Sequence, residues 1–143
     1  MNVTNLLAVK GRDVATIDRS RTLHDAVALL RDRGIGALVV ASEDQRPLGM
    51  ISERDVVRAI ATDGVGAMER PVEPTMSRDV VTCTETTTVD ELMATMTERR
   101  IRHVPVVAQG RLVGLVSIGD VVKARVTELE LARRELLDYV NAR

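Results

Sequence analysis

The alternation of apolar and polar residues passes through the same set of patterns twice. A short β-branched run comes first, at Val14–Ile17 and again at Val80–Cys83, and predicts a strand. Apolar residues then recur at i, i+4 and i+7, which predicts a helix with one buried face. Two apolar runs joined by a short turn predict a β-hairpin, and another helix follows. Each copy is therefore expected to form strand, helix, strand, strand, helix.

The predicted elements occupy matching positions in the two copies. The offset is 66 residues at the first strands (Val14 to Val80) and 65 at the last helices (Ser52 to Ser117), because the first copy's turn is one residue longer. A repeat of this size does not usually bury its apolar face alone, so the two copies should pack face to face with matching clefts. The fold class is α/β (α+β), with two pseudo-symmetric units packed through their sheets and a long C-terminal helix.

The helix signals divide the chain further. Helices are expected to begin after Thr22 and Thr88, where each Thr is followed three residues later by an acid, as in a capping box. Gly34 suits the end of the first of these helices, whereas Arg100 at the matching place predicts a different ending. The predicted units are a leader (1–13), repeat 1 (14–61), a linker with a second leader (62–79), repeat 2 (80–125) and a helix extension (126–143).

The last helix carries a partial apolar face beyond Lys123. Two explanations remain open: the helix lies on its own domain, or it forms a dimer contact. The second is favoured because a fold of 143 residues rarely needs so long a helix as a cover. The face consists of Val122, Val126, Leu129, Leu136 and Tyr139.

Composition excludes several classes of function. The net charge is −1 and the only aromatic residue is one Tyr, which argues against binding to nucleic acid or to an anionic membrane surface. No apolar run is long enough to span a membrane, and the first 13 residues show no secretory signal, so a cytoplasmic protein is expected. No phosphate-binding loop, nucleophile turn or paired metal-ligand histidines occur, so no enzyme and no metal site are predicted.

Both copies end on Ser-x-x-Asp where a strand meets a helix, at Ser52–Asp55 and Ser117–Asp120. The simplest explanation is a helix cap, since Ser followed by an acid at the third position is a capping-box variant. The repetition at equivalent places favours a second role. A carboxylate beside a helix N-terminus can accept both hydroxyls of a ribose, while the Ser hydroxyl and the free helix N–H groups hold a phosphate.

The two repeats resemble CBS motifs (cystathionine β-synthase domains), and the pair resembles a Bateman module. The resemblance covers 14–61 and 80–125, and its markers are Ile-x-x-Val-Pro-Val in the second copy and Gly-hydrophobic-hydrophobic-Ser-x-x-Asp in both. It implies binding of an adenosine-containing ligand (AMP, ADP, ATP, NAD(H) or S-adenosylmethionine) in clefts between the repeats. It also implies regulation of an attached or partner protein.

Carried onto this sequence, the resemblance gives each residue class a role. Asp55 and Asp120 would bind ribose hydroxyls, with Ser52 and Ser117 holding ribose or phosphate. Aliphatic groups would enclose adenine, and backbone of the first strands would read its edge. The residues concerned are Ile35, Ala37 and Leu38 with Thr16 and Ile17 in one copy, and Ile101, Val104 and Pro105 with Thr82 and Cys83 in the other. Ile118 and Gly119, inside the second Ser-x-x-Asp, complete the expected nucleotide site.

The clefts are expected to be unequal. Arg102–His103 in the second copy stand where the first has Gly36–Ala37, and basic side chains suit phosphate. Alternatively, Arg102 is a solvated surface charge and His103 a packed strand residue. Arg54 would compensate in the first copy, and Lys10 and Arg12 of the leader would reach a phosphate from the edge. Mg²⁺ is expected only when carried by a polyphosphate.

These features predict a regulatory module that senses adenine nucleotides, forms a homodimer and signals in trans to an unknown partner protein. The alternative is an interaction module that binds no ligand and acts through the C-terminal helix.

Overall fold

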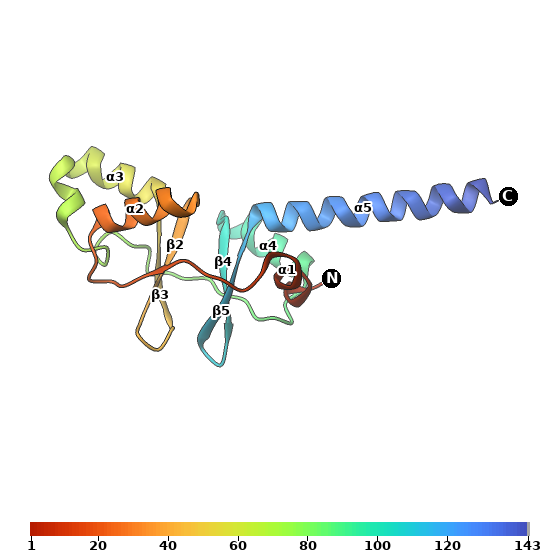
Figure 1. The fold of residues 1–143 in the computed structure, drawn as a ribbon, viewed down its shortest axis with the longest axis horizontal. Coiled ribbons are helices and arrows are strands. Elements are labelled where there is room, and N and C mark those ends of the chain that lie inside the picture. Colours follow the sequence, from red (N-terminus) through yellow and green to blue (C-terminus); the bar gives the residue numbers. More distant parts are fainter. Residues whose placement is uncertain (143) are drawn as a thin grey trace.

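The computed structural model describes residues 1–142, and its elements alternate as the repeat predicts (Figure 1). The first part contains α1 (Val3–Lys10), β1 (Thr16–Ile17), α2 (Leu23–Arg33), β2 (Ala37–Ala41), β3 (Pro47–Ser52), α3 (Glu53–Asp63) and the 3-10 helix η1 (Val65–Glu69). The second part contains α4 (Val89–Arg99), β4 (His103–Ala108), β5 (Arg111–Ser117) and α5 (Ile118–Asn141).

The first repeat forms a three-stranded sheet in the order β1-β2-β3. β1 is parallel to β2, with Thr16 beside Val39, and β2 is antiparallel to β3. Capping boxes start α2 and α4, as predicted. Both helices end on a left-handed residue, Gly34 at φ 63° and Arg100 at φ 55°, so the expectation of a different ending at Arg100 was wrong.

The second repeat keeps the β4–β5 hairpin, but the strand predicted at 80–83 is reduced to one bridge between Cys83 and Val106. The partner residue explains this difference. In the first repeat the Val39 N–H donates to the Ala15 carbonyl (3.3 Å). The matching residue of the second repeat is Pro105, which has no N–H and therefore cannot make that ladder bond.

The two leaders are exchanged between the repeats. Helix α1 packs into the core of the second repeat, where Val3 and Leu7 are at most 1% exposed. Val72 and Met76, which precede the second repeat, are buried in the core of the first. Each core is thus completed by the segment that comes before the other repeat. Figure 1 shows α1 beside α4.

Gly49 and Gly114, at matching places in β3 and β5, make room for these leaders. A Cβ on Gly49 would lie 2.7 Å from Met76 Sδ and from the Ser77 carbonyl oxygen. A Cβ on Gly114 would lie 2.8 Å from a Leu7 methyl group. Glycine is needed at both positions because another segment of the chain passes directly over the strand.

The two hairpins lie next to each other in the middle of the molecule (Figure 1). The turn between β2 and β3 is joined to the start of β5 by a hydrogen bond from the Leu112 N–H to the Gln45 carbonyl (2.8 Å). In β2, Leu38 and Val40 belong to the core shared with α2, whereas Val39 alternates with them and is also fully buried. Both faces of β2 are therefore covered.

Candidate functional site

Both Ser-x-x-Asp segments form reciprocal capping boxes at the start of α3 and α5. Asp55 Oδ2 accepts from the backbone N–H (2.8 Å) and hydroxyl (2.9 Å) of Ser52. Asp120 Oδ2 accepts from the Ser117 N–H (2.8 Å), and Ser117 Oγ accepts from the Asp120 N–H (3.2 Å). The cap fixes the orientation of each carboxylate. No hydrogen bond within residues 1–142 uses Oδ1 of either aspartate.

Most of the helix N–H groups expected to be free for phosphate have partners. The first N–H of α3, on Glu53, donates to the Gly36 carbonyl (3.1 Å). The first N–H of α5, on Ile118, donates to the Arg102 carbonyl (2.8 Å). The third N–H of each helix donates to the capping Ser. An anion at these helix starts would therefore depend more on side chains than on the backbone.

Lys10 reaches the second Ser-x-x-Asp from the end of α1. Its Nζ donates to Asp120 Oδ2 (2.6 Å) and to the Leu115 carbonyl (2.7 Å). The contact follows from the exchanged leader, because packing of α1 on β5 brings its last residue to the start of α5. Burial alone would raise the pKa of Asp120, but the hydrogen bonds from Lys10 and Ser117 lower it below its usual value. Asp120 is therefore ionised and paired at neutral pH.

His103 belongs to the same cluster. It pairs with Ser117 across the β4–β5 ladder and is partly buried. Burial is the main cause that lowers its pKa from 6.5, and the positive charges of Lys10 and Arg102 add to the shift, while Asp120 opposes it. His103 is therefore neutral at pH 7. The structure thus brings Lys10, His103, Ser117 and Asp120 together at one end of the second repeat.

The first repeat carries no such basic group. Asp55 forms no ion pair within the described chain, and Arg54 beside it is exposed. Arg12, the other leader residue predicted to reach a phosphate, is paired with Glu85 instead. The two helix starts thus share a cap and differ in charge.

The predicted adenine-contacting residues divide by burial. Leu38 and Val104 are fully buried in the two cores, which differs from their expected place on the cleft wall. Ile35 and Ile101 are only partly buried beside those cores. Pro105 and Ala37 lie on the strand faces opposite to the cores, and the backbone of Cys83 bonds to Pro105 (3.0 Å). Of the aliphatic residues predicted to enclose adenine, only Ile35 and Ile101 are partly exposed.

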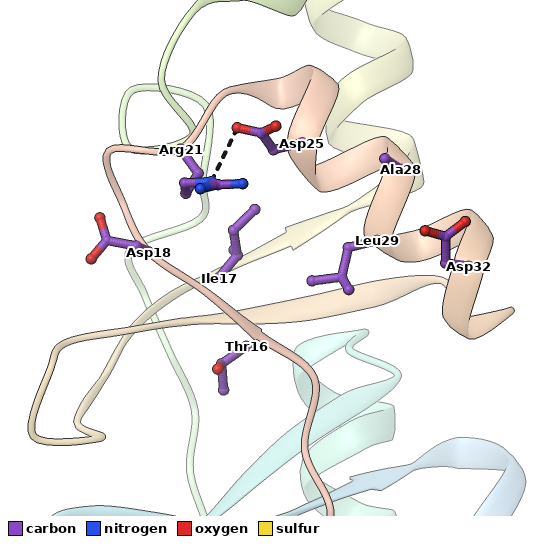
Figure 2. Close-up of a pocket in the computed structure, with 8 residues that line it drawn as sticks. All are labelled: Thr16, Ile17, Asp18, Arg21, Asp25, Ala28, Leu29 and Asp32. Carbon is purple, nitrogen blue, oxygen red and sulfur yellow. Dashed lines mark ion pairs between the residues drawn. The ribbon is translucent and has the colours of Figure 1, made fainter.

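A hollow of about 460 Å³, which the sequence did not predict, opens along α2 and β1 (Figure 2). Thr16 and Ile17 contribute to it, and Asp18, Asp25 and Asp32 place carboxylates around it. Arg21 spans part of the opening through an ion pair with Asp25 (3.2 Å). A second hollow of about 630 Å³ lies near the β2–β3 turn, between Ser20 and Asp44. Neither hollow contains Asp55 or Asp120.

Comparison with known families identifies the repeats. The CBS domain model matches residues 8–62 and 70–127. This chain belongs to the CBS-domain family. The prediction of a tandem CBS protein with two repeats and a long C-terminal helix is confirmed.

The chain is similar to the mitochondrial CBS domain-containing protein CBSX3 of Arabidopsis thaliana, with 40% identity over 85% of this chain and 59% of that protein. It thus spans about three-fifths of that relative. Among solved structures, the CBS-domain containing protein ATU1752 of Agrobacterium tumefaciens is 45% identical, with a TM-score of 0.84, over 87% of this chain and 99% of that one.

Two similar structures contain ligands. The CBS domain protein PAE2072 of Pyrobaculum aerophilum, in complex with AMP, has 30% identity and a TM-score of 0.79 over 93% of this chain and 99% of that one. The CBS domain pair of protein MJ0100, with 5′-methylthioadenosine and S-adenosyl-L-methionine, has 25% identity and a TM-score of 0.80 over 90% of this chain and 98% of that one.

None of the helices in residues 1–142 contains an apolar stretch that could span a bilayer.

Proposed function

We propose that this CBS pair is a regulatory module that binds adenosine-containing ligands at the starts of α3 and α5 and signals in trans to a partner protein. The observation that carries the proposal is the cluster of Lys10, His103, Ser117 and Asp120, which joins a fixed carboxylate to basic side chains. Carboxylates accept the paired hydroxyls of a ribose, and ammonium groups bind phosphate. A nucleoside phosphate carries its ribose hydroxyls and its phosphate a few ångströms apart, so one such molecule would contact both the carboxylate and the ammonium group.

The second repeat is the proposed phosphate-selective site. Ribose hydroxyls donate to Asp120, whose Oδ1 is available beside the capped Oδ2. Lys10 moves from the carboxylate to the phosphate, and Arg102 provides a second cation. Adenine lies between aliphatic groups at Ile101 and Pro105, since the chain has no Phe or Trp to stack on it.

The first repeat is the proposed site for ligands without a 5′-phosphate. Asp55 has no ion-pair partner in the described chain, and a carboxylate without a cation beside it favours a neutral or cationic group at the 5′ position. The complexes of PAE2072 with AMP and of MJ0100 with methylthioadenosine and S-adenosylmethionine represent these two ligand classes. NAD(H), ADP and ATP belong to the first class, and Mg²⁺ would accompany only a polyphosphate.

Regulation would follow from linkage: a ligand that binds one arrangement of the repeats more tightly shifts the population toward it. Helix α5 begins at the second site, so a change at Asp120 is transmitted directly to the surface of α5. A cytoplasmic location is part of the proposal.

Isothermal titration calorimetry with AMP, adenosine, NAD⁺ and S-adenosylmethionine, each with and without Mg²⁺, tests the proposal. Asp120→Asn should weaken AMP binding by about tenfold or more, because a charged acceptor is lost. Asp55→Asn should do the same for S-adenosylmethionine. Asp25→Asn is the matched control, since Asp25 closes a capping box of the same kind at the start of α2.

Each alternative gives a distinct result. Loss of AMP binding in Asp25→Asn would place the ligand in the hollow along α2. If neither Asp120→Asn nor Asp55→Asn changed ligand binding, the assignment of these carboxylates to the ribose hydroxyls would be wrong. If none of the ligands binds the unaltered protein, an interaction module that acts through α5 would replace the sensor.

A further inference from the structure

The second half of α5 extends away from the rest of the molecule (Figure 1). Every residue from 129 to 142 is exposed, including Leu129 (64%), Leu136 (66%) and Val140 (62%). Helices in proteins gain most of their stability from packing of an apolar face, and isolated segments of about 12–15 residues are marginal in water. A projecting apolar helix therefore requires a surface to pack against.

Most of the exposed apolar residues of α5 follow a coiled-coil spacing, and Leu137 and Tyr139 lie on the flanks of that row. Successive steps of four and three residues connect Val122, Val126, Leu129, residue 133, Leu136 and Val140, which we name the α5 seam. One position of the seam is polar, Arg133. Leu131 is also exposed (55%), but its place in the heptad puts it on the opposite side of the helix. The seam has the width of a two-helix contact.

We propose that the α5 seam pairs antiparallel with the α5 seam of a second copy of this chain. In a parallel pair, each seam residue meets its own copy, so Arg133 would face Arg133 in the apolar contact. In an antiparallel pair centred near residue 131, Val126 meets Leu136 of the other copy, and Arg133 meets Leu129. The antiparallel arrangement thus removes the Arg133–Arg133 contact from the seam and buries only the aliphatic part of Arg133.

Charge complementarity supports a second copy as the occupant. In the antiparallel register, Glu130 lies beside the seam, next to the point where the Arg133 side chain of the other copy leaves the contact. The two residues are offset along the helix axis by about one residue. The two-fold axis generates this Glu–Arg pair twice. Neither side chain forms a salt bridge within the described part of its own chain. Among the charged residues, only Glu130 lies near its own counterpart across the two-fold axis. Each of these two carboxylates has Arg133 of the other copy beside it.

The proposed antiparallel pairing also covers the whole length of the exposed apolar row on α5. Val140 meets Val122, which is 52% exposed at the base of the helix, so the contact ends where α5 joins its own domain. The inference is independent of any nucleotide and of the proposed sensor.

Sedimentation velocity of the full chain over a range of concentrations tests the contact. The unaltered protein should dimerise. The double variant Leu129→Glu/Leu136→Glu should raise the dimer dissociation constant by at least about 100-fold, because each copy loses two buried leucines. Leu131→Glu is the matched control and should leave the constant unchanged. A monomer at all concentrations, or a dimer that survives the double variant, would overturn the proposal.

Disulfide formation tests the orientation. Ala132→Cys lies near the axis and should join two antiparallel copies, whereas Val126→Cys should not, because the two residues would be ten positions, or about 15 Å, apart. The opposite result would establish a parallel pair. Cys83 does not interfere, since it is buried and burial raises its pKa to about 11. Arg133→Glu should weaken the dimer, and Arg133→Glu/Glu130→Arg should restore it if the ion pair crosses between copies.

Discussion

Replacement of Lys10 by Met is the sharpest test of how the second site works. Lys10→Met keeps most of the apolar stem on α1 and removes the ammonium that contacts Asp120 Oδ2 at 2.6 Å and the Leu115 carbonyl at 2.7 Å. The two side chains of the ion pair are 32% and 24% exposed, so solvent screens part of the interaction. We expect the free energy of unfolding to fall by about 1 kcal/mol.

The effect on ligand binding should depend on the phosphate. A charge-assisted hydrogen bond contributes about 1.5–3 kcal/mol, so loss of the ammonium should weaken AMP binding by about 10- to 100-fold. Adenosine has no phosphate for Lys10 to bind. It should bind the variant equally well or better, because its ribose no longer competes with the ammonium for Asp120. The preference for AMP over adenosine should therefore fall by at least about tenfold.

Isothermal titration calorimetry with both ligands measures that preference. Lys123→Met is the matched control: Lys10 and Lys123 are the only lysines, and Lys123 lies exposed on α5. The control should show the same AMP preference as the unaltered protein. An equal loss of affinity for AMP and adenosine in Lys10→Met would refute the reasoning, since it would mean that Lys10 supports the site without contacting phosphate. An unchanged preference would refute it as well.

Two further variants test the fold around the site. Gly49→Ala should lower stability by about 1–3 kcal/mol in chemical denaturation, because its Cβ would meet the Ser77 carbonyl; Gly114→Ala should cost less, because the Leu7 side chain can turn aside. A larger cost at Gly114 would contradict this order. Stability should also fall as the pH drops below about 6.5, because His103 in the unfolded chain takes up a proton there while the folded His103, with its lowered pKa, stays neutral to a lower pH. His103→Gln should flatten the stability curve in that window, and a curve of unchanged slope would exclude His103 as its source.

The local features of the site were predictable because they depend on neighbours in the sequence. A Ser and an acid three residues later form a capping box wherever a helix starts, and both Ser52 and Ser117 do so. The strand at 80–83 was predicted from its own β-branched residues and was almost lost. Its pairing depended on residue 105 of another strand, where proline offers no N–H.

Contacts over long sequence distances were predicted only in part. The sequence placed Lys10 at the edge of a phosphate site, but its pairing with Asp120, 110 residues away, emerged only in the structure. Leu38 and Val104 carry the right chemistry for an adenine wall, but alternation along a strand does not say which face is turned to the core. The repeated Gly49 and Gly114 were a usable signal, since a glycine at matching strand positions indicates close passage of another segment.

The sequence by itself determined the repeat, the order of elements within it and the caps that hold two carboxylates at helix starts, because these depend on periodicity and on interactions within a few residues. Only the tertiary structure decided that each leader completes the core of the other repeat, and with it that Asp120 has a lysine partner while Asp55 has none. The physical reason is that apolar leaders gain the same burial from either core. Gly49 and Gly114 leave room for a leader on both hairpins, so neither hydrophobicity nor the glycines alone assign a leader to a core, and the packing of the whole fold does.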